Sequence, residues 1–76
     1  MSHYGFLMWL RNHYNSWEIQ QTYHQIAAEN GALNYGSVRT YLLKLIEAGY
    51  ITVENQGKHN QTYTIDQDKF EELING

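Results

Sequence analysis

The sequence predicts a small α+β domain: three helices, with a short strand between the first two, are followed by a β-hairpin and a final short helix. Apolar residues recur at three- and four-residue steps in several stretches, which is typical of amphipathic helices. Two segments rich in β-branched and aromatic residues flank a polar connector that contains glycine, which is typical of a hairpin. A chain of 76 residues has room for a single domain, residues 1–76.

The composition excludes several classes of protein. The chain is 42% hydrophobic and 17% charged, so it has the apolar groups that a disordered tail lacks. Cysteine is absent, which excludes disulfides and zinc–thiolate sites. No apolar run approaches the roughly 18 residues of a membrane span, and residues 1–10 show no signal-peptide pattern. We therefore expect a soluble, cytoplasmic protein with no membrane partner.

The first helix is predicted over residues 4–14, where apolar residues follow a helical period and Ser2 is a suitable N-cap. The residues of its apolar stripe are Phe6, Trp9, Leu10, His13 and Tyr14. Asn15 and Ser16 are expected to end this helix, because both compete for backbone hydrogen bonds. Residues 17–21 then alternate apolar with polar side chains, which predicts a short half-buried strand.

The second helix is predicted over residues 23–30, with signals at both ends. Thr22 and Gln25 match the pattern of a capping box, and Gly31 can adopt the left-handed conformation that closes a helix. The third helix is predicted over residues 34–48, with Asn34 as its cap. Its core-facing residues, from a step of about 100° per residue, are Val38, Leu42 and Leu45.

A β-hairpin is predicted after the third helix, which Gly49 is expected to end. Residues 50–54 and 61–65 have the β-branched and aromatic composition of strands, and residues 55–60 form the polar loop between them. Asp66 is a suitable cap for the final helix. The residues of that helix expected to face inward are Phe70, Leu73 and Ile74.

Two segments resemble the winged helix-turn-helix family of DNA-binding proteins. Residues 22–31, TYHQIAAENG, resemble the first helix and turn of a helix-turn-helix. Residues 37–51, SVRTYLLKLIEAGYI, are similar to the recognition helix and the strand entry of that family. The resemblance covers about residues 5–65. It implies a winged helix-turn-helix with a three-helix core, a β-hairpin wing at loop 55–60 and a short C-terminal helix, and it implies a small stand-alone transcription regulator.

The predicted third helix, residues 34–48, has the properties of a helix that enters DNA. A major groove about 12 Å wide admits one α-helix, which must be held from behind by apolar residues and present polar side chains in front. The candidate DNA-binding residues of this helix are Asn34, Tyr35, Ser37, Arg39, Thr40 and Lys44. In loop 55–60, Lys58 and His59 match the position at which a wing touches the adjacent groove or backbone.

The net charge of −3 argues mildly against a nucleic-acid partner, but its distribution matters more than its sum. Residues 1–65 sum to zero, the deficit lies in residues 66–76, and residues 31–46 contain no acid. We therefore predict sequence-specific binding of double-stranded DNA in transcription regulation. One helix with few cations binds weakly, so a homodimer on a two-fold operator is expected. The residues of its expected dimer surface are Phe6, Met8, Trp9, Phe70, Leu73 and Ile74.

A second function stays open: a winged-helix protein–protein interaction module without DNA binding. The acidic C-terminal segment and the outward-facing Leu43 favour this alternative. A positive face joining Arg39, Lys44 and Lys58 would favour DNA, whereas dispersal of these three cations would favour the interaction module.

No motif for catalysis or for metal binding is present. The four histidines, His3, His13, His24 and His59, have none of the spacings of a zinc site. There is no glycine-rich phosphate loop and no obvious base beside a nucleophile. We expect no enzyme activity, no metal, no cofactor and no small-molecule ligand.

Overall fold

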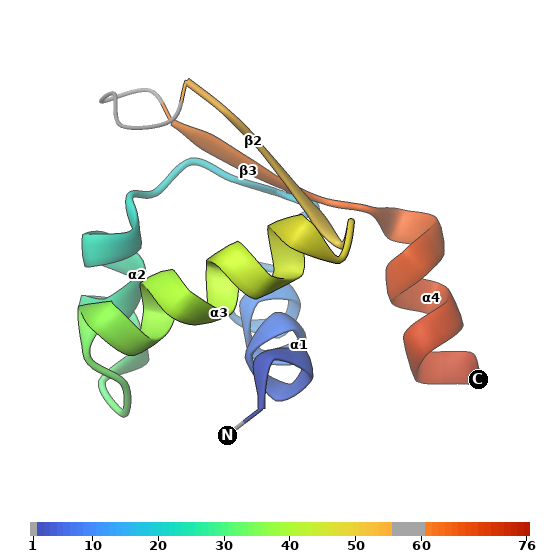
Figure 1. Ribbon diagram of the computed structural model, residues 1–76, viewed down its shortest axis with the longest axis horizontal. Helices are drawn as coiled ribbons and strands as arrows, with labels where there is room; N and C mark the ends of the chain where they lie inside the picture. Colours follow the sequence, from blue (N-terminus) through green and yellow to red (C-terminus); the bar gives the residue numbers. More distant parts are fainter. Residues whose placement is uncertain (1, 56–60) are drawn as a thin grey trace.

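A computed structural model describes residues 2–55 and 61–76 of the chain. These residues form four helices and a three-stranded antiparallel sheet, a small α+β fold (Figure 1). The elements in chain order are α1 (His3–Tyr14), β1 (Glu18–Ile19), α2 (Tyr23–Asn30), α3 (Tyr35–Glu47), β2 (Ile51–Glu54), β3 (Thr62–Ile65) and α4 (Gln67–Asn75).

Each helix begins at the cap residue that the sequence predicts. The Ser2 hydroxyl accepts from the amide of Gly5 at 3.1 Å, and the Asp66 carboxylate accepts from the amide of Lys69 at 2.9 Å. Thr22 and Gln25 form the full capping box, with reciprocal hydrogen bonds of 3.2 and 2.8 Å. These bonds satisfy amide groups that the first turn of a helix leaves without a partner.

The ends of the helices also follow local backbone chemistry. Gly31 closes α2 with φ of 74°, as predicted. Helix α3 ends one residue before the predicted boundary: Ala48 is its C-cap, and Gly49, with φ of 85°, follows it. The amide of Gly49 donates to the carbonyl of Ile46 at 3.1 Å, and the next amide donates to Leu45 at 2.9 Å. This is a Schellman motif, which requires the positive φ that glycine adopts easily.

The sheet has the strand order β1-β3-β2, with both pairs antiparallel. The hairpin pairs Ile51 with Ile65, so two buried side chains lie opposite each other on the core face. The first strand is shorter than the predicted residues 17–21, because only Glu18 and Ile19 pair with β3. Gln20 and Gln21 instead lead the chain to the cap of α2.

The core lies between the sheet and the first three helices. Its buried hydrophobic residues are Phe6, Leu7, Leu10, Ile19, Ile26, Ala27, Val38, Leu42, Leu45, Ile51, Tyr63, Ile65 and Phe70. The prediction that Val38, Leu42 and Leu45 hold α3 from behind is confirmed. Leu7 is fully buried although the predicted stripe of α1 omits it, whereas Trp9 is only half-buried.

Three residues of α1 and α4 lie differently from the prediction. Ile74 was expected to face inward but is 50% exposed, because it lies near the end of α4, beyond the last buried position of that helix. Phe6 and Phe70 were expected at a dimer surface but are buried within the protomer. The ring of Phe70 packs edge-on against Trp17, with centroids 5.5 Å apart. Neither phenylalanine can therefore lie on an interface between copies.

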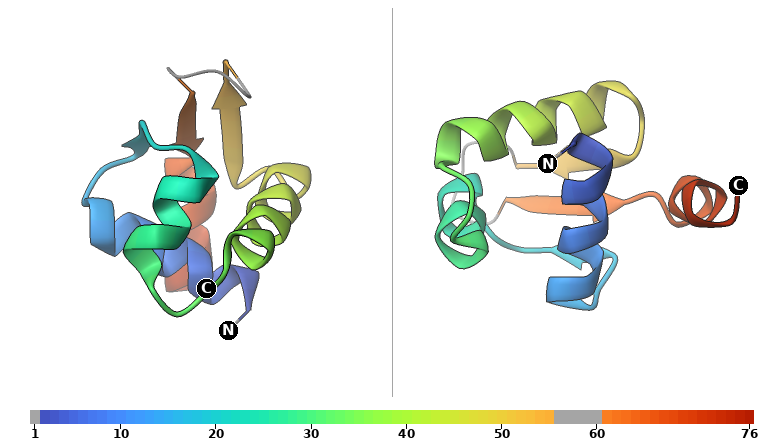
Figure 2. Two further views of the ribbon diagram at one scale, coloured as in Figure 1. Left: turned by 90° about the vertical axis from the view of Figure 1, so that its left-hand side faces the viewer. Right: turned by 90° about the horizontal axis from the view of Figure 1, so that it is seen from below.

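Helices α2 and α4 lie at opposite ends of the molecule (Figure 2). Helix α2 and the N-terminal half of α3 lie at one end, and α4 stands at the opposite end (Figures 1 and 2). The ends of β2 and β3 that lead into residues 56–60 point toward the α2 end (Figure 1). Among the residues that the structure describes, no helix is long and apolar enough to cross a membrane.

Candidate nucleic-acid interface

Helix α3 is held so that one long side faces solvent. The side-chain oxygen of Asn34 accepts from the amide of Ser37 at 2.8 Å, which fixes the start of the helix. Three apolar residues on the back of α3 are buried in the core. The opposite side, which includes Gly36, Thr40 and Leu43, is exposed. The sequence therefore positions one turn-and-helix segment with a continuous solvent-facing surface.

Arg39 and Lys44 are exposed on this surface, and within residues 2–55 and 61–76 they form no ion pair. At about 100° per residue they lie about 140° apart around the helix axis, one on each flank of the exposed side. Other described cations have partners. Arg11 stacks over the ring of Trp17 at 4.3 Å, and Lys69 donates to the carbonyl of Ala48 at 2.7 Å. Arg39 and Lys44 thus straddle the exposed side of α3 instead of forming one cluster.

The uncharged candidate residues line a shallow depression at the start of α3. The depression is formed by Asn34, Gly36, Ser37, Thr40 and Tyr41. The Thr40 hydroxyl donates to the carbonyl of Gly36 at 3.0 Å, so it is oriented by the helix itself. Ser37 is half-buried, while Thr40 is exposed. The structure therefore brings three of the predicted residues, Asn34, Ser37 and Thr40, onto one surface.

An aromatic cluster at the N-termini of α2 and α3 extends this surface. Tyr23, His24 and Tyr35 form it: the ring centroids of Tyr23 and His24 are 4.4 Å apart, and those of His24 and Tyr35 are 4.8 Å apart. Tyr35 is 57% exposed. Sequence reasoning selected Tyr35 but missed the other two. The available signal was positional, because Tyr23 and Tyr35 each directly follow the N-cap of a helix.

The predicted wing residues, Lys58 and His59, lie outside the described residues. Among the residues that are described, no group of three or more His, Asp or Glu side chains could hold a metal ion.

Comparisons with protein-family models, with curated proteins and with solved structures found no match. The function is therefore inferred from the residues of this chain and their geometry.

Proposed function

We propose that the protein binds double-stranded DNA sequence-specifically, as a small winged-helix transcription regulator, with α3 in the major groove and loop 55–60 as its wing. One observation carries the proposal. The exposed side of α3 has two cations without an ion-pair partner in the described chain, the short polar side chain of Thr40 between them, and no acid before Glu47 at its C-terminal end. Such a surface fits a groove that is lined by phosphates and presents polar base edges.

The order of the elements supports the winged-helix assignment. A helix, a short strand, two helices joined by a short turn, and a hairpin follow one another, with β1 added to the edge of the hairpin sheet. This is the layout that the sequence resemblance implies.

The aromatic cluster has a consistent place in this proposal. Amide groups at a helix N-terminus attract phosphate, and Tyr35 lies in the first turn of α3. A tyrosine hydroxyl at that position can donate to a backbone phosphate. Tyr35 and His24 would then fix the position of α3 along the duplex without reading a base.

A homodimer remains part of the proposal, because two helices with few cations bind a two-fold operator more tightly than one. With Phe6 and Phe70 buried, the exposed apolar residues Tyr4 and Ile74 are better candidates for its surface. Sedimentation equilibrium of the wild type and of the Ile74→Asp variant tests this part, and we expect the variant to be monomeric.

The alternative, a protein–protein interaction module, is favoured by two observations. Arg39 and Lys44 lie on opposite flanks of the exposed side of α3 and form no single positive cluster, which is the arrangement expected for that module. Leu43 is 41% exposed in the middle of the outer side of α3, where a groove-binding helix more often carries a polar residue. If α3 binds DNA, Leu43 would contact a thymine methyl group, which apolar side chains recognise.

A titration of fluorescent duplexes at several salt concentrations distinguishes the two functions. The probes are a random-sequence duplex and a duplex selected by the protein from a random library. We expect Arg39→Gln and Lys44→Gln each to reduce the slope of log K against log salt by about 1 wherever the residue touches a phosphate. Substitution of a residue that reads guanine would instead weaken binding to the selected duplex by about 1–3 kcal/mol and leave binding to the random duplex unchanged.

Arg11→Gln is the matched control, because it removes a cation from α1, on another side of the core. It should leave both measurements unchanged. If the protein binds neither duplex at low salt, or if added DNA shifts only NMR resonances of residues 66–76, the DNA-binding proposal is wrong and the interaction module replaces it.

A further inference from the structure

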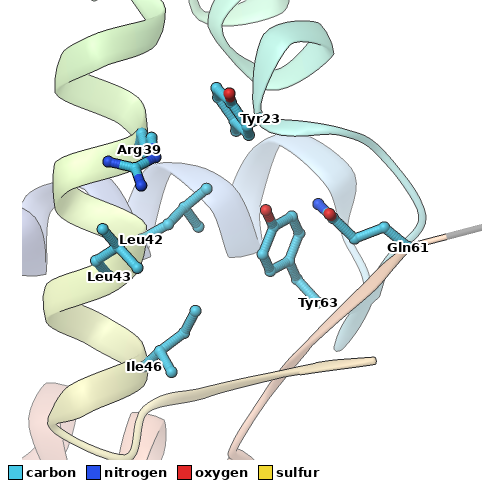
Figure 3. Close-up of a pocket in the computed structure, with 7 residues that line it drawn as sticks. All are labelled: Tyr23, Arg39, Leu42, Leu43, Ile46, Gln61 and Tyr63. Atoms are coloured by element: carbon cyan, nitrogen blue, oxygen red, sulfur yellow. The ribbon is translucent and has the colours of Figure 1, made fainter. Parts of the chain in front are cut away.

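A cavity of about 130 Å³ opens between α3 and the start of β3 (Figure 3). One wall comes from α3, and the other comes from residues of α2 and the hairpin. An engineered cavity of about 150 Å³ lined by apolar residues binds benzene, so this cavity has the size of a single six-membered ring.

The α3 wall of the cavity is apolar. It consists of Leu42, Leu43 and Ile46, and the side chains of Leu42 and Ile46 extend toward Tyr63 (Figure 3). Leu42 is buried, Ile46 is half-buried, and Leu43 is exposed, so apolar character extends from the core to the opening. An apolar wall of this kind favours a ring or a short hydrocarbon over a strongly hydrated ligand.

The opposite wall is polar and buried. Tyr63 and Gln61 are each only 5% exposed, and the Tyr63 hydroxyl points toward the space between Leu42 and Gln61 (Figure 3). Burial raises the pKa of the Tyr63 phenol, while its hydrogen bond with Gln61 acts in the opposite direction. The hydroxyl therefore stays protonated at neutral pH and is able to donate or to accept one hydrogen bond.

Arg39 stands on the same side of α3 as Ile46 and contributes to the lining of the cavity. Its guanidinium forms no ion pair with any residue that the structure describes. A guanidinium binds carboxylates through two parallel hydrogen bonds. The cavity therefore combines an apolar wall, a buried hydroxyl and a cation.

We propose that this cavity binds a small monocyclic carboxylic acid, with its ring between Ile46 and Tyr63 and its carboxylate on Arg39. A hydroxyl group on the ring, opposite the carboxylate, would pair with Tyr63. Because Arg39 cannot serve the ligand and a phosphate at the same time, the bound acid competes with DNA. This competition rests on the DNA-binding function proposed above, whereas ligand binding itself does not.

The ligand site is tested on the full chain without DNA. The probes are 4-hydroxybenzoate, benzoate and 4-hydroxybenzyl alcohol, followed by calorimetry and by methyl NMR. We expect saturable shifts at Leu42, Leu43 and Ile46, with 4-hydroxybenzoate binding most tightly. The uncharged alcohol should bind about tenfold more weakly than 4-hydroxybenzoate, since it loses the charge-assisted pair with the guanidinium.

Three variants examine the groups separately. Arg39→Gln should weaken the binding of 4-hydroxybenzoate by about tenfold and leave the binding of the alcohol unchanged. Tyr63→Phe should abolish the preference for 4-hydroxybenzoate over benzoate. Leu43→Trp starts from an exposed position, so it should close the cavity without unfolding the protein, which circular dichroism checks. Arg11 is a cation of α1 that does not line the cavity, so the Arg11→Gln variant should bind all three probes like the wild type.

The absence of saturable shifts at the three α3 residues would overturn the proposal, as would binding that Leu43→Trp and Arg39→Gln both leave intact. The regulatory part is then measured by adding 4-hydroxybenzoate to the protein–duplex complex. Release of the duplex from the wild type at a lower concentration of 4-hydroxybenzoate than of benzoate, with this difference lost in Tyr63→Phe, supports competition. Ligand binding without release of a bound duplex refutes it. If the protein binds no duplex at all, the DNA-binding function proposed above is wrong, while the NMR titration still shows whether the cavity binds the acid.

Discussion

Glu29 connects the first two helices through both of its carboxylate oxygens. The hydroxyl of Tyr14 donates to Oε2 at 3.1 Å, and Nε2 of His13 lies 3.1 Å from Oε1. Tyr14 also packs against the core. Burial, followed by the hydrogen bond and the negative charge of Glu29, raises the pKa of the Tyr14 phenol far above its usual value of 10.0. The phenol is thus coupled to the packing of α1 on α2.

This raised pKa predicts a loss of stability at high pH. In the unfolded chain, Tyr14 loses its proton near pH 10, whereas in the folded chain it keeps the proton to a higher pH. Between these two values the folded state binds more protons, so the free energy of unfolding falls as the pH rises. Below about pH 10 the contribution is fully present.

We expect the urea midpoint to be flat from about pH 8 to 9.5 and to fall above about pH 10. Tyr14→Phe should make the fall shallower but should not abolish it, because Tyr50 and Tyr63 also have raised pKa values. An unchanged slope in Tyr14→Phe would show that this phenol does not titrate differently in the two states.

At the scale of the elements, α4 is joined to the end of α3 by one lysine. The ammonium of Lys69 donates to the carbonyl of Ala48 at 2.7 Å and lies 5.0 Å from the ring centroid of Tyr50. A cation near the last carbonyls of a helix is stabilised by the helix dipole. Lys69 is therefore a structural cation, and this explains why it does not contribute to the surface of α3.

Lys69→Met should lower the free energy of unfolding by about 1 kcal/mol and should speed hydrogen exchange of the α4 amides. The hydrocarbon length is preserved, so the loss reports the hydrogen bond and the charge. Lys44→Met is the control: it is exposed, and a surface substitution of this kind changes stability by less than about 0.5 kcal/mol. Equal effects of the two substitutions would contradict the docking role of Lys69.

The sequence predicts the elements well where the determining interactions are local. The caps at Ser2, Thr22, Asn34 and Asp66 each bond to an amide three residues away, so residue type and spacing suffice. Helical phase likewise identifies the core face of α3. Phase does not show how far along a helix its neighbours extend, and this is why Ile74 was expected to be buried.

The candidate surfaces were predictable only in part, for the same reason. The outer side of α3 follows from periodicity within one helix. His24 reaches Tyr35 from a different helix, and Gln61 and Tyr63 reach α3 from the hairpin. These contacts depend on how the elements pack in the folded chain. No spacing or motif in the sequence links α2 or the hairpin to α3, so the contacts could not be predicted.

At the scale of the whole molecule, a group of acids lies at one end of the longest dimension. The principal extents are 33, 25 and 22 Å. The acids Asp68, Glu71 and Glu72 lie on α4, and α4 stands at the end opposite α2 and the N-terminal half of α3 (Figure 1). Electrostatic interactions are screened over about 8 Å at 0.15 M salt and over about 30 Å at 0.01 M. If α3 binds DNA as proposed, these acids should act on it mainly when the salt concentration is low.

The triple variant Asp68→Asn, Glu71→Gln and Glu72→Gln measures this separation, while the cap residue Asp66 is kept. We expect the Kd for a random duplex to change by less than about twofold at 0.15 M salt, because α4 stands at the end of the molecule opposite the N-terminal half of α3 and the screening length is then only about 8 Å. At 0.01 M salt the same variant should bind several-fold more tightly, since the screening length then approaches the length of the molecule. A gain of about tenfold or more at 0.15 M salt would mean that α4 lies against the duplex. The duplex would then contact the C-terminal end of α3, where Lys69 holds α4, and not the N-terminal half that carries Asn34, Ser37 and Thr40.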